Sequence, residues 1–139
     1  MISTIYQAKL LHVVDGDTID VDADLLHGLH VNARIRLVGI DAPEAYGSTR
    51  EYGEKATLAL EGLLNNKGNG DLVLIHWKDL KDHDSFGRWL CNVQINTPNP
   101  IDASTWMMNQ GYAVSWQRHL DGFEWNTQMT FPLELGFRG

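Results

Sequence analysis

Apolar and polar residues alternate strictly along two stretches of the chain, 19–25 and 31–38, as in a β-strand with one buried face. The predicted buried positions are Ile19, Val21, Ala23 and Leu25 in the first stretch and Val31, Ala33, Ile35 and Leu37 in the second. The residues between them, 26–30, contain a glycine and are expected to form a hairpin connection. Arg36 falls on the opposite, polar face of the second strand.

Three further segments are typical of strands. Residues 5–14 are rich in β-branched and aromatic side chains and precede a turn, while 72–77 form a short apolar run. In the third segment, 88–95, Arg88 precedes an alternating pattern whose core positions are Trp89, Cys91, Val93 and Ile95. Arg88, like Arg36, is therefore expected to face away from the core.

Two helices are predicted between and after these strands. Ser48 at the N-cap and Glu51 three residues later match a capping box, so we expect a helix over 50–64. A second short helix is capped by Asp102 or Ser104 and ends at a glycine, Gly111. Beyond Trp116 the pattern fades, and 120–129 are expected to form at most one or two helical turns.

Short strands combined with segregated helices favour a small α+β fold, a closed β-barrel with flanking helices. At 139 residues the chain suits one domain, and a five-stranded barrel of the oligonucleotide-binding (OB-fold) type fits this length. We expect residues 1–116 to form the barrel domain and residues 117–139 to be a C-terminal extension that packs on it.

Composition narrows the possibilities further. The formal net charge is −7, which argues against a protein that coats nucleic acid through a basic face. The single cysteine, Cys91, excludes an internal disulfide, and the chain has no apolar run long enough to predict a membrane span. We expect a monomer. The start shows no secretion signal, so an intracellular protein, a virus- or mobile-element-encoded protein and a mature secreted form all stay open.

The candidate chemistry lies in two short acidic segments. Asp15-Gly16-Asp17-Thr18 is a turn, in which Gly16 is expected to leave room for a ligand, and Asp41-Ala42-Pro43-Glu44 is stiffened by its proline. Between Asp15 and Glu44 the chain carries seven acidic residues and two arginines. Concentrated carboxylates beside arginines suit a divalent cation that recruits an anion.

These segments, taken with Arg36 and with Asp84-Ser85-Phe86-Gly87-Arg88, resemble the staphylococcal nuclease (thermonuclease-like) family. The resemblance runs from about Val13 to Ala113. It implies a five-stranded OB-fold with flanking helices, so that residues 1–116 would be the nuclease domain. It also implies a calcium-dependent hydrolase with little sequence preference, which cleaves phosphodiester bonds of DNA, RNA or both and leaves 3′-phosphate ends.

The resemblance also implies a role for individual residues. Asp17, Asp41 and the Ala42 carbonyl match ligands of one Ca²⁺ ion, which Asp15 and Thr18 support from behind. Glu44 matches the residue that positions or deprotonates the attacking water, and Arg36 and Arg88 match the two arginines that grip the phosphate. Asp84 and Phe86 are expected to contact the substrate weakly, with Phe86 at a position where the best-known member has Tyr.

Two other functions stay open. One is a noncatalytic binding module for nucleic acid or protein, which the acidic net charge favours. Degraded members of the family lose the arginines or the glutamate, whereas this chain keeps Arg36, Glu44 and Arg88. The other is a calcium-dependent interaction protein without a nucleic-acid partner.

Overall fold

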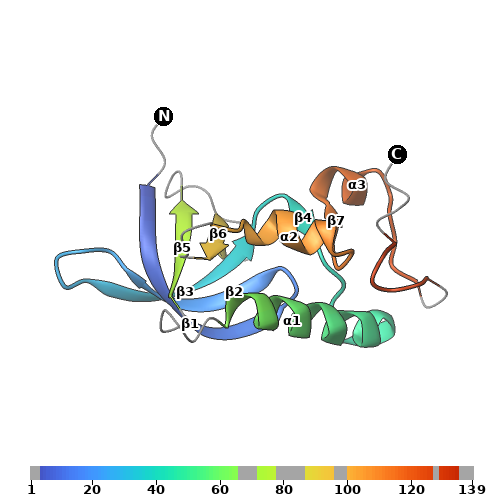
Figure 1. Cartoon of the computed structure of the whole chain (residues 1–139), viewed down its shortest axis with the longest axis horizontal. Helices are drawn as coiled ribbons and strands as arrows, with labels where there is room; N and C mark the ends of the chain where they lie inside the picture. Colours follow the sequence, from blue (N-terminus) through green and yellow to red (C-terminus); the bar gives the residue numbers. More distant parts are fainter. Residues whose placement is uncertain (1–3, 66–71, 78–86, 96–99, 127–128, 135–139) are drawn as a thin grey trace.

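Five strands close into a barrel in which β1 pairs with both β2 and β5 (Figure 1). A computed structural model describes residues 4–65, 72–77, 87–95, 100–126 and 129–134. The barrel strands follow the order β1-β2-β3-β6-β5, with bounds β1 Thr4–Asp15, β2 Thr18–Asp24, β3 His30–Leu37, β5 Leu72–Trp77 and β6 Trp89–Ile95. All neighbouring pairs are antiparallel except β3 and β6, which run parallel. The predicted five-stranded barrel with flanking helices is confirmed.

The alternating patterns correctly predict which faces are buried. Ile19, Val21 and Ala23 of β2 are fully buried, whereas Leu25 lies just beyond the strand and is only half-buried. Residues 26–28 have positive φ angles, as a tight hairpin connection between β2 and β3 requires. The last of these three residues is Gly28, and glycine adopts a positive φ at a lower cost than other residues because it has no Cβ.

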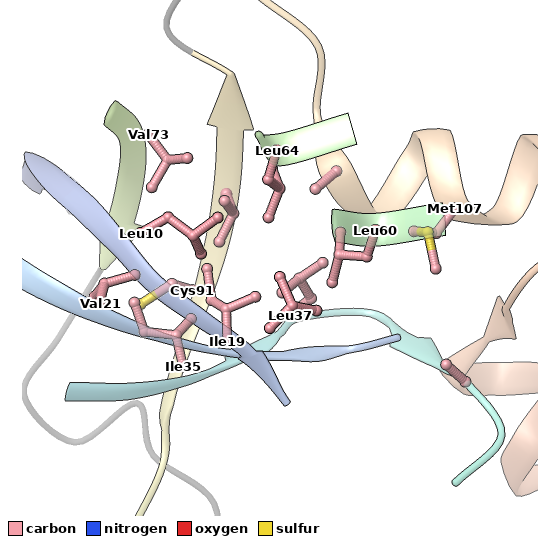
Figure 2. Packing of buried hydrophobic residues seen from close by; sticks show 14 of the residues in the cluster. Leu10, Ile19, Val21, Ile35, Leu37, Leu60, Leu64, Val73, Cys91 and Met107 are labelled. Carbon is pink, nitrogen blue, oxygen red and sulfur yellow. The ribbon is translucent and has the colours of Figure 1, made fainter. Parts of the chain in front are cut away.

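Helices α1 (Arg50–Leu64) and α2 (Ala103–Asn109) cover one end of the barrel. Leu60 and Leu64 of α1 and Met107 of α2 are fully buried, and they meet barrel side chains such as Leu37 in one continuous core (Figure 2). The bounds of α1 match the predicted helix 50–64. Its apolar stripe is what joins the helix to the barrel.

The predicted capping box at the start of α1 is wrong. Ser48 lies inside a short 3₁₀ helix, η1 (Gly47–Thr49), and the N-cap of α1 is Thr49, whose side chain makes no capping bond. The Thr49 hydroxyl instead donates to the Glu44 carbonyl oxygen at 2.8 Å. The 3₁₀ helix leads directly into α1, and its backbone takes the place of a side-chain cap at the start of α1. In α2 the N-cap is Asp102, which accepts from the Thr105 amide at 3.0 Å.

The last helix begins earlier than predicted. Helix α3 spans Trp116–Leu120, and the described residues after Asp121 are not helical, so the expectation of helical turns over 120–129 is wrong. The Ser115 hydroxyl caps α3 by accepting from the Arg118 amide at 3.1 Å. None of the five residues of α3 is buried, which is why no apolar stripe marks it in the sequence.

A second, two-stranded sheet was not predicted. Its strands are β4 (Ile40–Asp41) and β7 (Val114–Ser115), and the Trp116 amide extends it by donating to the Gly39 carbonyl oxygen at 2.8 Å. This small sheet fixes the chain just after β3 against the start of α3.

Residues that follow α3 pack back onto α1. The Phe131 ring stacks on Tyr52 with centroids 5.1 Å apart, and the Tyr52 hydroxyl donates to the Met129 carbonyl oxygen at 2.9 Å. The Leu133 amide donates to the Gly111 carbonyl oxygen at 2.7 Å. Within the described part of the chain, no helix has the length and apolar character needed to cross a membrane.

Candidate functional site

A cavity of about 500 Å³ lies where the β1–β2 turn, the ends of β3 and β4, the start of β6 and helix α3 meet. It gathers seven of the residues singled out in the sequence: Asp15, Asp17, Arg36, Asp41, Ala42, Glu44 and Arg88. Thr18 is buried directly beside it. Asp84 and Phe86 lie outside the residues that the structure describes.

Asp17 is the most constrained carboxylate of the cavity. It is buried, its Oδ1 accepts from the Thr18 hydroxyl at 2.9 Å, and its Oδ2 accepts from the Ala42 amide at 3.0 Å. The second bond ties the β1–β2 turn to the segment that carries Asp41. The Thr18 hydroxyl therefore restrains the orientation of the Asp17 carboxylate.

The Arg36 guanidinium lies between two carboxylates. Its Nη1 is 3.4 Å from Asp17 Oδ2 and donates to the Ile40 carbonyl oxygen at 3.0 Å, while its Nη2 is 3.8 Å from Asp41 Oδ1. The Arg36 Cζ lies over the Trp116 ring, 5.4 Å from the ring centroid. Arg36 is thus held by charge, by backbone and by an aromatic ring, and only 12% of its side chain is exposed.

Asp41 is held by residues that come much later in the chain. Its Oδ2 accepts from the Trp125 indole N–H at 3.3 Å and lies 3.3 Å from His119 Nδ1. Burial raises the pKa of the Asp41 carboxyl, and the nearby Asp17 charge raises it further. His119, the Trp125 hydrogen bond and Arg36 lower this pKa and oppose that effect.

Asp15 and Glu44 complete the acidic lining. Burial raises the pKa of Asp15, and so do the charges of Asp17 and Glu44, while a bond from the Ala45 amide and the Arg88 charge lower it. Glu44 is exposed to solvent at the mouth of the cavity. A hydrogen bond with Glu44 raises the pKa of the Tyr46 hydroxyl.

Two glycines allow the backbone to converge on this cavity. A Cβ at Gly16 would lie 2.7 Å from the Ala56 Cβ and 2.9 Å from the Ala42 Cβ, so Gly16 lets the turn pack against α1. The expectation that it leaves room for a ligand is therefore wrong. A Cβ at Gly53 would lie 2.3 Å from the carbonyl carbon and oxygen of Glu44, so α1 directly supports the Glu44 backbone.

The donors suit a hard divalent cation by type and charge. Four carboxylates face two guanidiniums in the cavity, which leaves an excess of two negative charges at neutral pH. Asp17 and Asp41 approach the same guanidinium, so their side chains converge. Among the described residues, no group of three or more His, Cys, Asp or Glu side chains is close enough to form a ready-made metal site. Calcium, which also takes carbonyl and water oxygens, needs no such group.

Sequence reasoning missed Trp116, His119 and Trp125. Trp116 and His119 line the cavity, and their rings stack with centroids 4.5 Å apart. Their spacing of three residues puts them on one face of α3, a signal that becomes visible only once Ser115 is identified as a helix cap. Trp125 lies in irregular chain and leaves no such signal.

The barrel and its acidic, arginine-containing cavity agree with the comparison of this sequence with known families. Residues 34–130 match the model of the family described as "Staphylococcal nuclease homologue". The chain belongs to this family, which supports a nuclease-like or nucleic-acid-binding module. The match includes Arg36, Asp41, Glu44 and Arg88, whereas Asp15, Asp17 and Thr18 precede it.

Two curated relatives are similar over most of the chain. Protein ParB of Escherichia coli is 34% identical over 119 residues, which cover 81% of this chain and 59% of that protein. An uncharacterized protein of Methanocaldococcus jannaschii is 28% identical over 130 residues, which cover 78% of this chain and 58% of that protein. The chain therefore spans less than two thirds of the length of either relative.

Proposed function

We propose that this protein is a calcium-dependent, largely sequence-nonspecific nuclease that hydrolyses phosphodiester bonds of DNA, RNA or both and leaves 3′-phosphate ends. The observation that carries the proposal is the convergence of Arg36 and Arg88 with four carboxylates in one cavity. Carboxylates alone suit a cation, but two guanidiniums beside them suit a cation that is shared with a phosphate.

Asp17, Asp41 and the Ala42 carbonyl would hold one Ca²⁺ ion, with Asp15 nearby. Bound calcium would supply a positive charge that attracts the scissile phosphate and makes a neighbouring water easier to deprotonate. The buried, hydrogen-bonded Asp17 is well suited to this task, because its orientation is fixed before any ligand arrives.

Glu44 would accept the proton of the attacking water, since its carboxylate is at the cavity mouth and open to solvent. The water oxygen would bond to phosphorus, the bond to the 5′ oxygen would break, and that oxygen would take a proton from solvent. Arg36 and Arg88 would meet the negative charge that gathers on the phosphorus oxygens. Removing one such donor typically lowers kcat about 10²- to 10³-fold.

The test compares Arg36→Ala with Arg34→Ala in calcium-dependent cleavage of labelled single-stranded DNA and RNA. Arg34 is two residues earlier on β3 and pairs with Asp20 at 2.8 Å outside the cavity, so it is a matched control. We expect wild type and Arg34→Ala to cleave in calcium and stop in chelator, and Arg36→Ala to be about 10²- to 10³-fold slower. Product ends should resist polymerase extension until a phosphatase removes the 3′-phosphate.

Arg36 neutralises the buried carboxylate of Asp17 and the half-buried carboxylate of Asp41, so circular dichroism must show that each variant is folded. Arg36→Lys provides a second variant, because it keeps the charge but loses the planar fork. A folded wild type that leaves both nucleic acids intact in calcium would refute the proposal. Calcium-independent binding without cleavage, unchanged in Glu44→Ala, would instead favour the noncatalytic binding module.

A further inference from the structure

Two side chains from the segment that follows the barrel converge on a single oxygen of Asp41. The Trp125 indole N–H donates to Asp41 Oδ2 at 3.3 Å, and His119 Nδ1 lies 3.3 Å from the same oxygen. The other oxygen, Oδ1, faces the Arg36 guanidinium at 3.8 Å. The two oxygens of this carboxylate therefore have different surroundings: one is turned toward the C-terminal segment and the other toward Arg36.

The Trp125 ring is itself fixed by aromatic contacts. Its edge contacts join it to Phe123, with centroids 4.9 Å apart, and to Phe131, with centroids 5.4 Å apart. Phe131 in turn stacks on Tyr52, a buried residue of α1. These contacts connect the Trp125 ring to the hydrophobic core, so the indole N–H that bonds Asp41 belongs to a side chain with a fixed orientation.

His119 comes from α3, earlier in the same segment. Its ring stacks on Trp116, and the Arg36 Cζ lies over the Trp116 ring. The carboxylate and the guanidinium that share the cavity are therefore both supported by α3 and the residues after it. A carboxylate with one oxygen tied down has lost most of its freedom to rotate, which favours a single orientation of the other oxygen.

We propose that Trp125 and His119 are positioning residues, which hold Asp41 Oδ2 so that Oδ1 is turned toward the calcium ion. This inference rests on the proposed function, because it takes Asp41 as a calcium ligand. It extends the site to the segment beyond residue 116, where the sequence motifs gave no indication of one. Neither residue needs to touch calcium or substrate for this role.

The test separates this role from simple packing. Trp125→Phe keeps an aromatic ring between Phe123 and Phe131 but removes the N–H donor. We expect the folded variant to bind calcium about 10-fold more weakly in isothermal titration calorimetry of the full chain. Trp106→Phe is the matched control, because that half-buried indole packs against the hydrophobic core from α2, and its calcium Kd should equal that of wild type.

His119→Leu should weaken calcium binding in the same direction as Trp125→Phe. Because both side chains contact the same oxygen, the double variant should be less impaired than two independent effects predict. His119→Gln, which keeps an N–H donor, should recover part of the lost affinity. A residue that merely stabilises the fold would lower the melting temperature without this pattern in the Kd.

A spectroscopic measurement on proteins that keep Trp125 covers the case in which Trp125→Phe does not fold. In a ¹H–¹⁵N spectrum, the Trp125 indole N–H signal should shift when calcium is added and in Asp41→Asn, while the Trp106 indole signal stays in place. Deuterium exchange of the Trp125 indole proton should also be faster in Asp41→Asn.

The outcomes are distinct for the two proposals. A wild type that binds no calcium overturns the proposed function and this inference together. This inference alone is overturned if the wild type binds calcium and cleaves nucleic acid but Trp125→Phe keeps the wild-type Kd. It is also overturned if the wild type does both but its Trp125 indole signal does not shift when calcium is added. Weaker calcium binding in Trp125→Phe together with a calcium-dependent indole shift supports it.

Discussion

Replacing Gly53 by alanine should uncouple the activity of this protein from its stability. Gly53 is the fourth residue of α1, where the added Cβ would come within 2.3 Å of the Glu44 carbonyl carbon and oxygen and 2.4 Å of the Ala45 amide nitrogen. All three are backbone atoms, which cannot rotate away as the end of a long side chain can. The helix and the Glu44 backbone must therefore separate.

The size of the effect follows from these distances. Ordinary van der Waals contact begins at 3.4 Å, so the Glu44 backbone must move by about 1.1 Å. Alanine gains about 1 kcal/mol of helix propensity over glycine, and overpacking typically costs about 1–3 kcal/mol, so we expect a net loss of stability of about 2 kcal/mol. A displacement of about 1 Å at a catalytic group can lower the rate about 100-fold.

The assay measures both quantities on the same samples. Urea unfolding gives the stability, and calcium-dependent cleavage of single-stranded DNA gives kcat. We expect Gly53→Ala to unfold at slightly lower urea and to lose about 100-fold in kcat. Independently of any activity, the backbone amide signals of Glu44 and Ala45 should shift in a ¹H–¹⁵N spectrum.

Gly62, on the same helix, is the matched control. A Cβ there would meet nothing within 4 Å, so Gly62→Ala should stabilise the protein by about 0.5–1 kcal/mol and leave kcat unchanged. If folded Gly53→Ala keeps the wild-type kcat and the wild-type Glu44 amide signal, the close approach of α1 does not position Glu44 and the reasoning is refuted.

Three further predictions concern stability. Phe131→Ala should lower the free energy of unfolding by about 3 kcal/mol in urea melts, because Phe131 is nearly buried against two tyrosines and a tryptophan; a loss under 1 kcal/mol would contradict this. Tyr52→Phe should cost about 1 kcal/mol through the lost bond to Met129, with the fold intact by circular dichroism. The hydrogen bond from Arg34 lowers the pKa of Asp20 below its ordinary value of 3.8. The pair therefore contributes its full stability at pH values above 3.8, and this contribution is lost as the pH falls through the lowered pKa. Arg34→Ala should therefore be less stable than wild type by about 0.2–1 kcal/mol at neutral pH, and the difference should shrink in acid.

The barrel was predictable because its strands are half-buried. In β2 and β3 every second residue is in the core, so the requirement to bury one face appears directly as alternation in the sequence. Strands β4 and β7 are two residues long, which is too short for any period to show. Helix α3 buries no residue, so it carries no apolar stripe.

The sequence predicted only those parts of the candidate site whose residues are close together in the chain. Asp15 and Asp17 share one turn, and Asp41 and Glu44 share one short segment, so their carboxylates are visible as motifs. The bond from Trp125 to Asp41 joins residues 84 positions apart, and no local pattern records it. The reason why position 16 requires a glycine was likewise not visible in the sequence. The residue that a Cβ at this position would clash with, Ala56, comes 40 residues later in a helix.

The parallel pairing of β3 with β6 has a consequence for how the chain folds. It sets Ile35 opposite Trp89, and this register places Arg36 and Arg88 at the same cavity. The chain between the two arginines is about fifty residues long and includes α1 and β5. Closing so long a loop costs more entropy than closing a hairpin, so we expect this pairing to form later than that of β2 with β3. The hairpin of β2 and β3 can form early, yet a half-folded chain holds one guanidinium without the other. Whatever the two arginines do together begins only in a chain that has closed its barrel.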